Sequence, residues 1–183
     1  MRDVTRLPSA PPAGGTLRPF QVDIFDPGSL SGAFAGCDAV ISAVGPRPGG
    51  PATIHADTAR ATLDAMAKTD VRRYVVVSAS GAYADAGDGP VTRFVVKPIL
   101  QRVLREGFAD IRQMEQLVRA SSLDWTVLRP PRLVDKPLTG RYRTAIDRNV
   151  RGGGSLSRAD TAHALLAAVA DPAVIHHTVL VAY

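Results

Sequence analysis

Two kinds of apolar pattern alternate along the 183-residue chain. Short runs rich in β-branched residues predict strands, and stretches with apolar residues three or four positions apart predict helices. The expected strands are 20–25, 37–45, 72–81, 123–133 and 177–183, and the expected helices are 27–36, 54–68, 98–121 and 157–169. Strands that alternate with helices predict an α/β fold with a parallel sheet and helical crossovers.

Two helix starts carry a polar signal. Gly107 is expected to divide the stretch 98–121, and Asp110 and Gln113 have the spacing of a capping box that would start its second half. Ser157 and Asp160 have the same relation before the last helix, so Ser157 is expected to cap it.

Length and composition predict one globular domain over residues 1–183. The net charge of +5 comes from scattered arginines, and only 5% of the residues are aromatic, so a nucleic-acid surface is not expected. No apolar run reaches the roughly 20 residues of a membrane span, and no membrane association is expected. The single cysteine, Cys37, fits a reducing compartment, and we predict a cytoplasmic protein.

The candidate chemistry lies in three loops that follow predicted strands: 43–47, 78–81 and 129–132. Ligands of open parallel sheets bind beyond the carboxyl ends of the strands. Glycine there admits a flat ligand, serine hydroxyls can donate hydrogen bonds, and paired prolines form a rigid wall. Each loop alone is more typical of an ordinary strand-to-loop transition, but three in sequential order favour a binding pocket.

Other kinds of site find no support in the sequence. The four histidines stand at no metal-ligand spacing with cysteine or carboxylates, so no metal is expected. The G-x-S-x-G pattern of hydrolases and the G-x-x-x-x-G-K-[ST] phosphate loop are both absent.

Segments 38–47, 71–83, 114–142 and 156–171 resemble the atypical short-chain dehydrogenase/reductases, which bind NAD(P) on a Rossmann fold. Within that class the chain is most similar to the small reductases of the biliverdin reductase B (flavin reductase) type and to NmrA-like proteins. The resemblance implies a Rossmann-like three-layer α/β fold with a mostly parallel sheet. It also implies NADP as cofactor, with NAD as the alternative.

The resemblance further implies an N-terminally incomplete fold. Relatives begin with a strand, a G-x-x-G-x-x-G loop, a helix and a second strand that ends in V-R-D, whereas this chain begins M-R-D. The first two strands and the first helix are therefore expected to be missing, which leaves 20–25 without a neighbour and the edge of 38–44 exposed. A start codon assigned too late is the favoured explanation and a genuine truncation the alternative. In either case we expect this form to bind dinucleotide poorly.

The resemblance assigns cofactor contacts residue by residue. Arg2 would face the adenosine 2′-phosphate, Asp23 and Ile24 the adenine, and Pro130, Pro131 and Arg132 the nicotinamide. Ala43, Val44 and Gly45 would run along the dinucleotide with Arg47 nearby, and Ser78 and Ser80 would place hydroxyls near the nicotinamide and the substrate, with Ser78 also a cofactor contact. Ser80 is also the preferred group to polarise the substrate, with Ser78 as the second catalytic candidate.

The chain departs from typical short-chain dehydrogenases at the Y-x-x-x-K pair, since Tyr74, Tyr83 and Tyr142 each lack a lysine four residues later. Lys97 is equally compatible with a role in the site and with a position at the surface. The expected function is NAD(P)H-dependent reduction of a flavin-, quinone- or carbonyl-type small molecule, with the proton supplied by solvent. The alternatives are a non-catalytic NmrA-like NADP sensor that binds a protein partner, and an inactive fragment.

Overall fold

The fold is described from a computed structural model that covers residues 15–85 and 87–183. Its centre is a five-stranded sheet with the strand order β1-β2-β3-β7-β5. The strands are β1 (Ala39–Ser42), β2 (Arg73–Val77), β3 (Asp124–Arg129), β7 (His177–Ala182) and β5 (Arg143–Ile146). The first four are parallel and only β5 runs antiparallel, beside β7. The predicted α/β fold with a mostly parallel sheet is confirmed.

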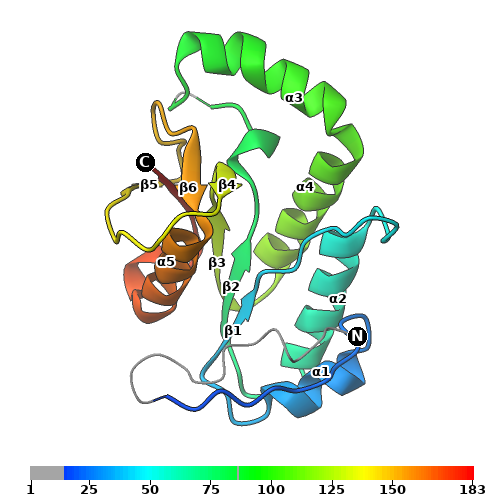
Figure 1. Cartoon of the computed structure of the whole chain (residues 1–183). Coiled ribbons are helices and arrows are strands. Elements are labelled where there is room, and N and C mark those ends of the chain that lie inside the picture. Colours follow the sequence, from blue (N-terminus) through cyan, green and yellow to red (C-terminus); the bar gives the residue numbers. More distant parts are fainter. Residues whose placement is uncertain (1–14, 86) are drawn as a thin grey trace.

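Helices cover both faces of this sheet, which makes three layers (Figure 1). The main helices are α1 (Pro27–Phe34), α2 (Ile54–Met66), α4 (Arg105–Ala120) and α5 (Arg158–Ala170). Helices α2 and α4 pack together on one face with α1 against α2, and α5 lies on the other face. The shorter elements are η2 (Ser80–Ala82), η3 (Thr92–Val96), α3 (Lys97–Val103), η4 (Pro172–Val174) and the two-stranded sheet of β4 (Arg132–Val134) and β6 (Ser155–Ser157).

The continuous apolar runs of the central strands follow from burial on both faces. In β2, Tyr74 and Val76 enter the core beneath α2 and α4, whereas Val75 enters the core beneath α5. In β3, Val127 and Leu128 divide in the same way. Alternate residues of a strand face opposite sides, so a sheet covered by helices on both faces needs apolar residues at every position.

Residues 20–25 form no strand, so that prediction is wrong. Their polar groups bond locally instead: the Asp23 carboxylate accepts the Phe25 N–H at 2.9 Å, and the Asp26 carboxylate accepts two N–H groups at the start of α1. Such local bonds compete with strand pairing. Within the described residues β1 pairs only with β2, and no strand lies on its other edge. The hypothesis of an absent N-terminal unit stays a prediction that the upstream DNA sequence tests.

The stretch 98–121 divides at Leu104, between α3 and α4, and not at Gly107. Asp110 lies inside α4 and caps a different helix: its carboxylate accepts the backbone N–H groups of His55 and Ala56 at the start of α2. Thr53, which precedes α2, makes no side-chain cap, and its hydroxyl donates to Asp57. The capping-box prediction for Asp110 is therefore wrong. The first N–H groups of α2 donate their hydrogen bonds to a carboxylate of α4.

The cap predicted for the last helix is confirmed, since the Ser157 hydroxyl accepts the Asp160 N–H at 2.9 Å. The buried Asp160 carboxylate in turn accepts hydrogen bonds from Tyr183, Gly140 and Thr139. Burial by itself raises the pKa of Asp160, but these donors outweigh it and hold the pKa well below its usual range.

Stability is therefore expected to fall in acid. In the unfolded chain the Asp160 pKa returns to about 3.9, so the unfolded state binds more protons than the folded state below about pH 4. The contribution of Asp160 is present above that pH and is lost as the pH falls toward the folded-state pKa. Urea unfolding of the Asp160→Asn variant should show lower stability at neutral pH and a smaller loss between about pH 5 and pH 3. Asp64→Asn, at an exposed position of α2, is the control that should follow the wild type.

Candidate functional site

The site lies where β1, β2 and β3 end. Their carboxyl ends lie at one edge of the sheet because the strands are parallel and paired in register. Two of the three predicted loops are bonded to each other: the Ser78 N–H donates to Leu128 O at 2.8 Å, and the Ser80 N–H donates to Pro130 O at 3.0 Å. Backbone hydrogen bonding thus holds the loops 78–81 and 129–132 side by side.

A groove runs beside the end of β1. It encloses about 320 Å³ and brings together three predicted cofactor residues, Ile24, Ala43 and Val44. Its other walls come from α1, β1 and α2: Leu30, Phe34, Val40, Ile41, Ser42, Thr58 and Thr62. Asp23 precedes Ile24 in the turn before α1, and Gly45 and Arg47 follow Val44 in the loop after β1. The lining is largely apolar, with hydroxyls on β1 and α2.

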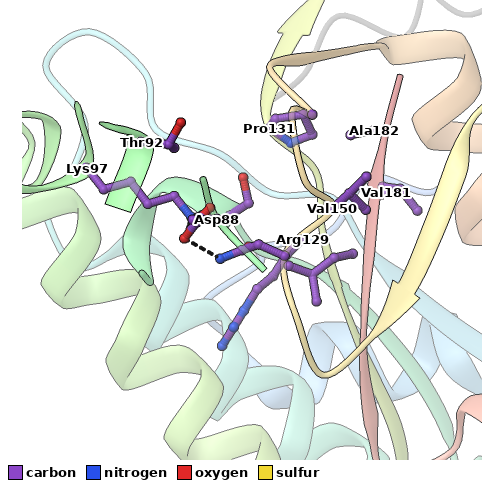
Figure 2. Close-up of a pocket in the computed structure, with 12 residues that line it drawn as sticks. Asp88, Thr92, Lys97, Arg129, Pro131, Val150, Val181 and Ala182 are labelled. Carbon is purple, nitrogen blue, oxygen red and sulfur yellow. Dashed lines mark hydrogen bonds and ion pairs between the residues drawn. The ribbon is translucent and has the colours of Figure 1, made fainter. Parts of the chain in front are cut away.

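A second, smaller cavity of about 40 Å³ lies beyond β2, β3 and β7 (Figure 2). Ser80 and Pro131, both predicted site residues, line it together with Arg129. Apolar residues of β7 and the loop before β6 close one side, and Asp88, Thr92, Lys97 and Asn149 form the polar side. Ser80 is therefore the predicted catalytic candidate whose position adjoins a cavity.

Ser78 faces the interior. It is buried, it does not line either cavity, and its hydroxyl donates to the Glu115 carboxylate of α4. Glu115 also accepts from Arg129, with Nε 2.8 Å from Oε1, and the second oxygen accepts the other end of the same guanidinium. Burial alone raises the pKa of Glu115, but Arg129 and the Ser78 hydroxyl outweigh it and hold that pKa below its usual range. Ser78 thus supports a buried ion pair beneath the site.

Tyr83 lies over this ion pair, with its ring centroid 3.5 Å from the Arg129 guanidinium carbon. Burial and the negative charge of Glu115 raise the pKa of Tyr83 to about 12. The tyrosine of a Y-x-x-x-K pair has its pKa lowered by the lysine, which is the opposite shift. Lys97 donates to the backbone oxygen of Tyr83 at 2.6 Å, not to the phenol. The phenol of Tyr83 therefore stays protonated and is a poor proton donor.

Sequence reasoning missed a polar cluster made of Asp88, Lys97 and Asn149. Lys97 is only 6% exposed, and its ammonium lies 2.8 Å from the Asp88 carboxylate, so its interpretation as a surface residue is wrong. The available signal was the position of Lys97 within the apolar run "FVVKPIL", where a lone charge requires a partner. Nothing in the sequence singles out Asn149, which comes from a different loop.

The other predicted site residues do not line either cavity within the described part of the chain. Pro130 is buried and bonded to Ser80 through its carbonyl, whereas Arg132 is exposed and pairs in β4 with Ser155. Arg2 lies outside the described residues. Over the described ranges, no group of three or more metal-ligating side chains comes together, and no helix is long and apolar enough to cross a membrane.

Comparisons with known proteins show the family of the chain and support its fold. The family model described as NAD(P)H-binding matches residues 1–172. A candidate exported protein from Burkholderia pseudomallei is 29% identical, with a TM-score of 0.74 over 88% of this chain and 79% of its own. A short-chain dehydrogenase/reductase from Veillonella parvula, solved with NADP, is 19% identical, with a TM-score of 0.70 over 87% of this chain and 69% of its own.

A candidate NADH-flavin reductase from Streptococcus pneumoniae is 24% identical, with a TM-score of 0.68 over 87% of this chain and 77% of its own. The similarity to the Veillonella parvula and Streptococcus pneumoniae structures supports the fold alone. The family match extends over most of the chain and includes β1, β2 and β3, but it ends before β7. The chain therefore belongs to the NAD(P)H-binding family of Rossmann-fold proteins.

Proposed function

We propose that the protein is an NAD(P)H-dependent reductase of the atypical short-chain dehydrogenase/reductase class that acts on a small flavin-, quinone- or carbonyl-type molecule. The observation that carries the proposal is the position of Ser80 and Pro131. Both line a cavity at the carboxyl ends of parallel strands in a chain of an NAD(P)H-binding family. This is the edge at which such sheets bind nucleotides and substrates.

The residues of the two cavities fit a dinucleotide and an acceptor. The groove lined by Ile24, Ala43 and Val44 is large enough and apolar enough for a flat ring, and Gly45 leaves open space at its end. The bound cofactor would supply the hydride. The chain would hold the rings against Pro131, donate a hydrogen bond from Ser80 to the acceptor, and leave protonation to solvent, since Tyr83 is a poor acid. We propose NADP as the cofactor, with NAD as the alternative, and a cytoplasmic location.

The rival function is a non-catalytic NADP sensor of the NmrA type that binds a protein partner. The absence of a Y-x-x-x-K pair favours this rival, and the raised pKa of Tyr83 means that its phenol does not give up a proton readily. A sensor would bind the cofactor without turning it over. Cofactor binding and turnover therefore separate the two functions.

The test is NADPH oxidation, followed by absorbance, with flavin, quinone and aldehyde acceptors. We assay the purified protein with NADPH and, in parallel, with NADH, which decides the cofactor. Turnover of at least one of these acceptors is the expected result. Cofactor binding without turnover of any acceptor contradicts the reductase and supports the sensor.

Ser80→Ala is expected to lower kcat/KM for the acceptor by about tenfold, since one hydrogen bond to the substrate is worth about 1.4 kcal/mol. NADPH affinity should change little. Ser122→Ala, at an exposed position before β3, is the matched control and should retain full activity. An unchanged kcat/KM in Ser80→Ala would remove Ser80 from the proposed chemistry.

A further inference from the structure

Residues 91–104, which comprise η3, α3 and one residue at each end, form an apolar segment at the surface. Eight of the fifteen exposed large apolar side chains of the described chain lie within this segment. Among them, Phe94, Ile99 and Val103 are 70%, 60% and 73% exposed. Single exposed apolar side chains are ordinary, but a group of them in one segment marks an interaction surface.

The apolar segment turns its polar side chains toward the rest of the protein. Lys97 and Gln101 are four residues apart and so lie on one face of α3. Lys97 donates to the Tyr83 backbone oxygen at 2.6 Å, and Gln101 donates to the Gly81 backbone oxygen at 3.3 Å. A surface helix ordinarily turns its apolar face to the core. In this segment the arrangement is reversed, so its apolar face is available to a partner.

The outward side of the segment carries a continuous apolar stripe. Val96, Ile99 and Val103 have the i, i+3, i+7 spacing of one helical face, and all three are exposed. Figure 1 shows α3 at one end of the molecule, where its main packing contacts are with η2 and α4. The stripe therefore points away from the sheet and its core.

The charges beside this stripe indicate what kind of partner fits it. Arg93, Arg102 and Arg105 are exposed, and Glu106 is the only acidic residue in the sequence 91–106. A second copy of the chain on the same stripe would bring the arginines of both copies together, which is unfavourable. An apolar surface that carries negative charge complements both the stripe and the arginines.

We propose that the apolar segment docks the protein on an anionic phospholipid surface. Val96, Ile99 and Val103 would enter the boundary between headgroups and acyl chains, and the neighbouring arginines would contact headgroup phosphates. An apolar helix face flanked by basic residues is the pattern of helices that lie in this boundary. The expectation of no membrane association considers only spanning segments of roughly 20 residues, and a helix that lies on the surface needs no such length.

The docking face borders the small cavity. Thr92 and Lys97 belong to the apolar segment, and both line that cavity together with Ser80. An acceptor dissolved in the membrane, such as a quinone with a hydrocarbon tail, would therefore be presented beside the site. This consequence rests on the proposed function, whereas the docking itself does not.

Sedimentation with extruded vesicles tests the docking without cofactor or acceptor. The purified protein is mixed with vesicles of phosphatidylcholine alone or of an equal mixture of phosphatidylcholine and phosphatidylglycerol. Binding should be at least tenfold tighter to the anionic vesicles, because each arginine near an anionic surface contributes severalfold to affinity. High salt should weaken this binding by screening. Equal affinity for the two vesicle types, or affinity for neither, overturns the inference.

A double variant assigns the binding to the apolar stripe and its neighbours. Phe94→Gln with Ile99→Gln should weaken binding to the anionic vesicles at least tenfold, because two apolar side chains no longer enter the lipid. Leu166→Gln is the control, since Leu166 is exposed on α5 and lies outside the segment. Circular dichroism checks the fold of each variant. Undiminished binding by the folded double variant overturns the inference.

A second double variant tests the role of the charges. Arg102→Gln with Arg105→Gln should remove most of the preference for anionic over neutral vesicles. Arg141→Gln removes an exposed arginine elsewhere and should keep the preference. A preference equal to that of the wild type in Arg102→Gln with Arg105→Gln would overturn the recognition of negative charge by this segment.

The remaining measurements distinguish other occupants and the reductase proposal. Light scattering without lipid should give a mass that Phe94→Gln with Ile99→Gln leaves unchanged. A dimer that this variant dissociates, together with no vesicle binding by the wild type, would make a second copy the occupant and overturn the docking. Vesicle binding without NADPH turnover of any acceptor keeps the docking and removes the reductase. Turnover without vesicle binding keeps the reductase and overturns the docking.

Discussion

Replacing Glu115 by glutamine is expected to lower the free energy of unfolding by about 3–5 kcal/mol, the usual cost of breaking a buried ion pair from one side. Glu115 is 1% exposed and is the counter-charge of Arg129, which is itself buried. The glutamine can still accept a hydrogen bond, but it leaves the guanidinium without a negative partner. Arg119, at the surface end of the same network, adds a second positive charge.

Urea unfolding at neutral pH measures this loss, and Glu106→Gln in the first turn of α4 is the control because Glu106 is exposed. The control should change stability by less than about 1 kcal/mol. A double variant, Glu115→Leu with Arg129→Met, should be more stable than Glu115→Gln because it leaves no unpaired charge. A loss below about 1 kcal/mol in Glu115→Gln would mean that solvent reaches the Arg129 guanidinium in solution.

The same ion pair explains why the site geometry depends on α4. Glu115 holds the Ser78 hydroxyl and the Arg129 guanidinium. Ser78 directly follows β2, and Arg129 is the last residue of β3. The backbone bond from Ser80 to Pro130 lies directly beyond them. A buried network thus sets the positions of the two loops that line the small cavity. Variants at Glu115 should therefore lower acceptor binding as well as stability.

The central strands were predictable because burial leaves a signal in the sequence. The run "YVVV" in β2 must be apolar at each position, since helices cover both faces of the sheet. The segment 20–25 carries a similar apolar content but lacks a neighbouring strand in the described chain. Its Asp23 carboxylate and the following Asp26 carboxylate accept local N–H groups. Apolar pattern alone does not report whether a partner strand is present. The sequence pattern did not predict β5 because none of its four residues is buried, and it did not predict β6 because that strand has only three residues.

The site was predictable to the level of loops but not of side-chain direction. Ser78 and Ser80 are two residues apart in the same loop, yet one hydroxyl bonds to Glu115 in the interior and the other residue lines a cavity. Which serine faces inward depends on Glu115, 37 residues later in the sequence. Asn149 meets Asp88 across 61 residues. Contacts of this kind come from the packing of separate loops, and no local spacing encodes them.

The Asp110→Ala substitution is expected to destabilise the protein by about 2–3 kcal/mol, because it removes a helix cap and three hydrogen bonds to a buried carboxylate. Asp110 is buried in α4, and its oxygens accept from the His55 N–H at 2.8 Å and the Ala56 N–H at 2.9 Å. The ring Nδ1 of His55 lies 2.8 Å from the same carboxylate. The substitution leaves the first turn of α2 with unpaired donors inside the protein.

Thermal and urea unfolding of three variants test this assignment. Asp110→Asn keeps one oxygen that can accept from α2 but loses the charge, so its stability should lie between those of the wild type and Asp110→Ala. Asp57→Ala is the control, since Asp57 also stands in the first turn of α2 but pairs at the surface with Arg60, an arrangement worth less than about 1 kcal/mol. Equal effects at Asp110 and Asp57 would show that the cap from α4 contributes no more than a surface charge. The larger effect at Asp110 would show that α2 and α4 are joined by the carboxylate as well as by their apolar faces, and that the wall of the larger groove depends on both.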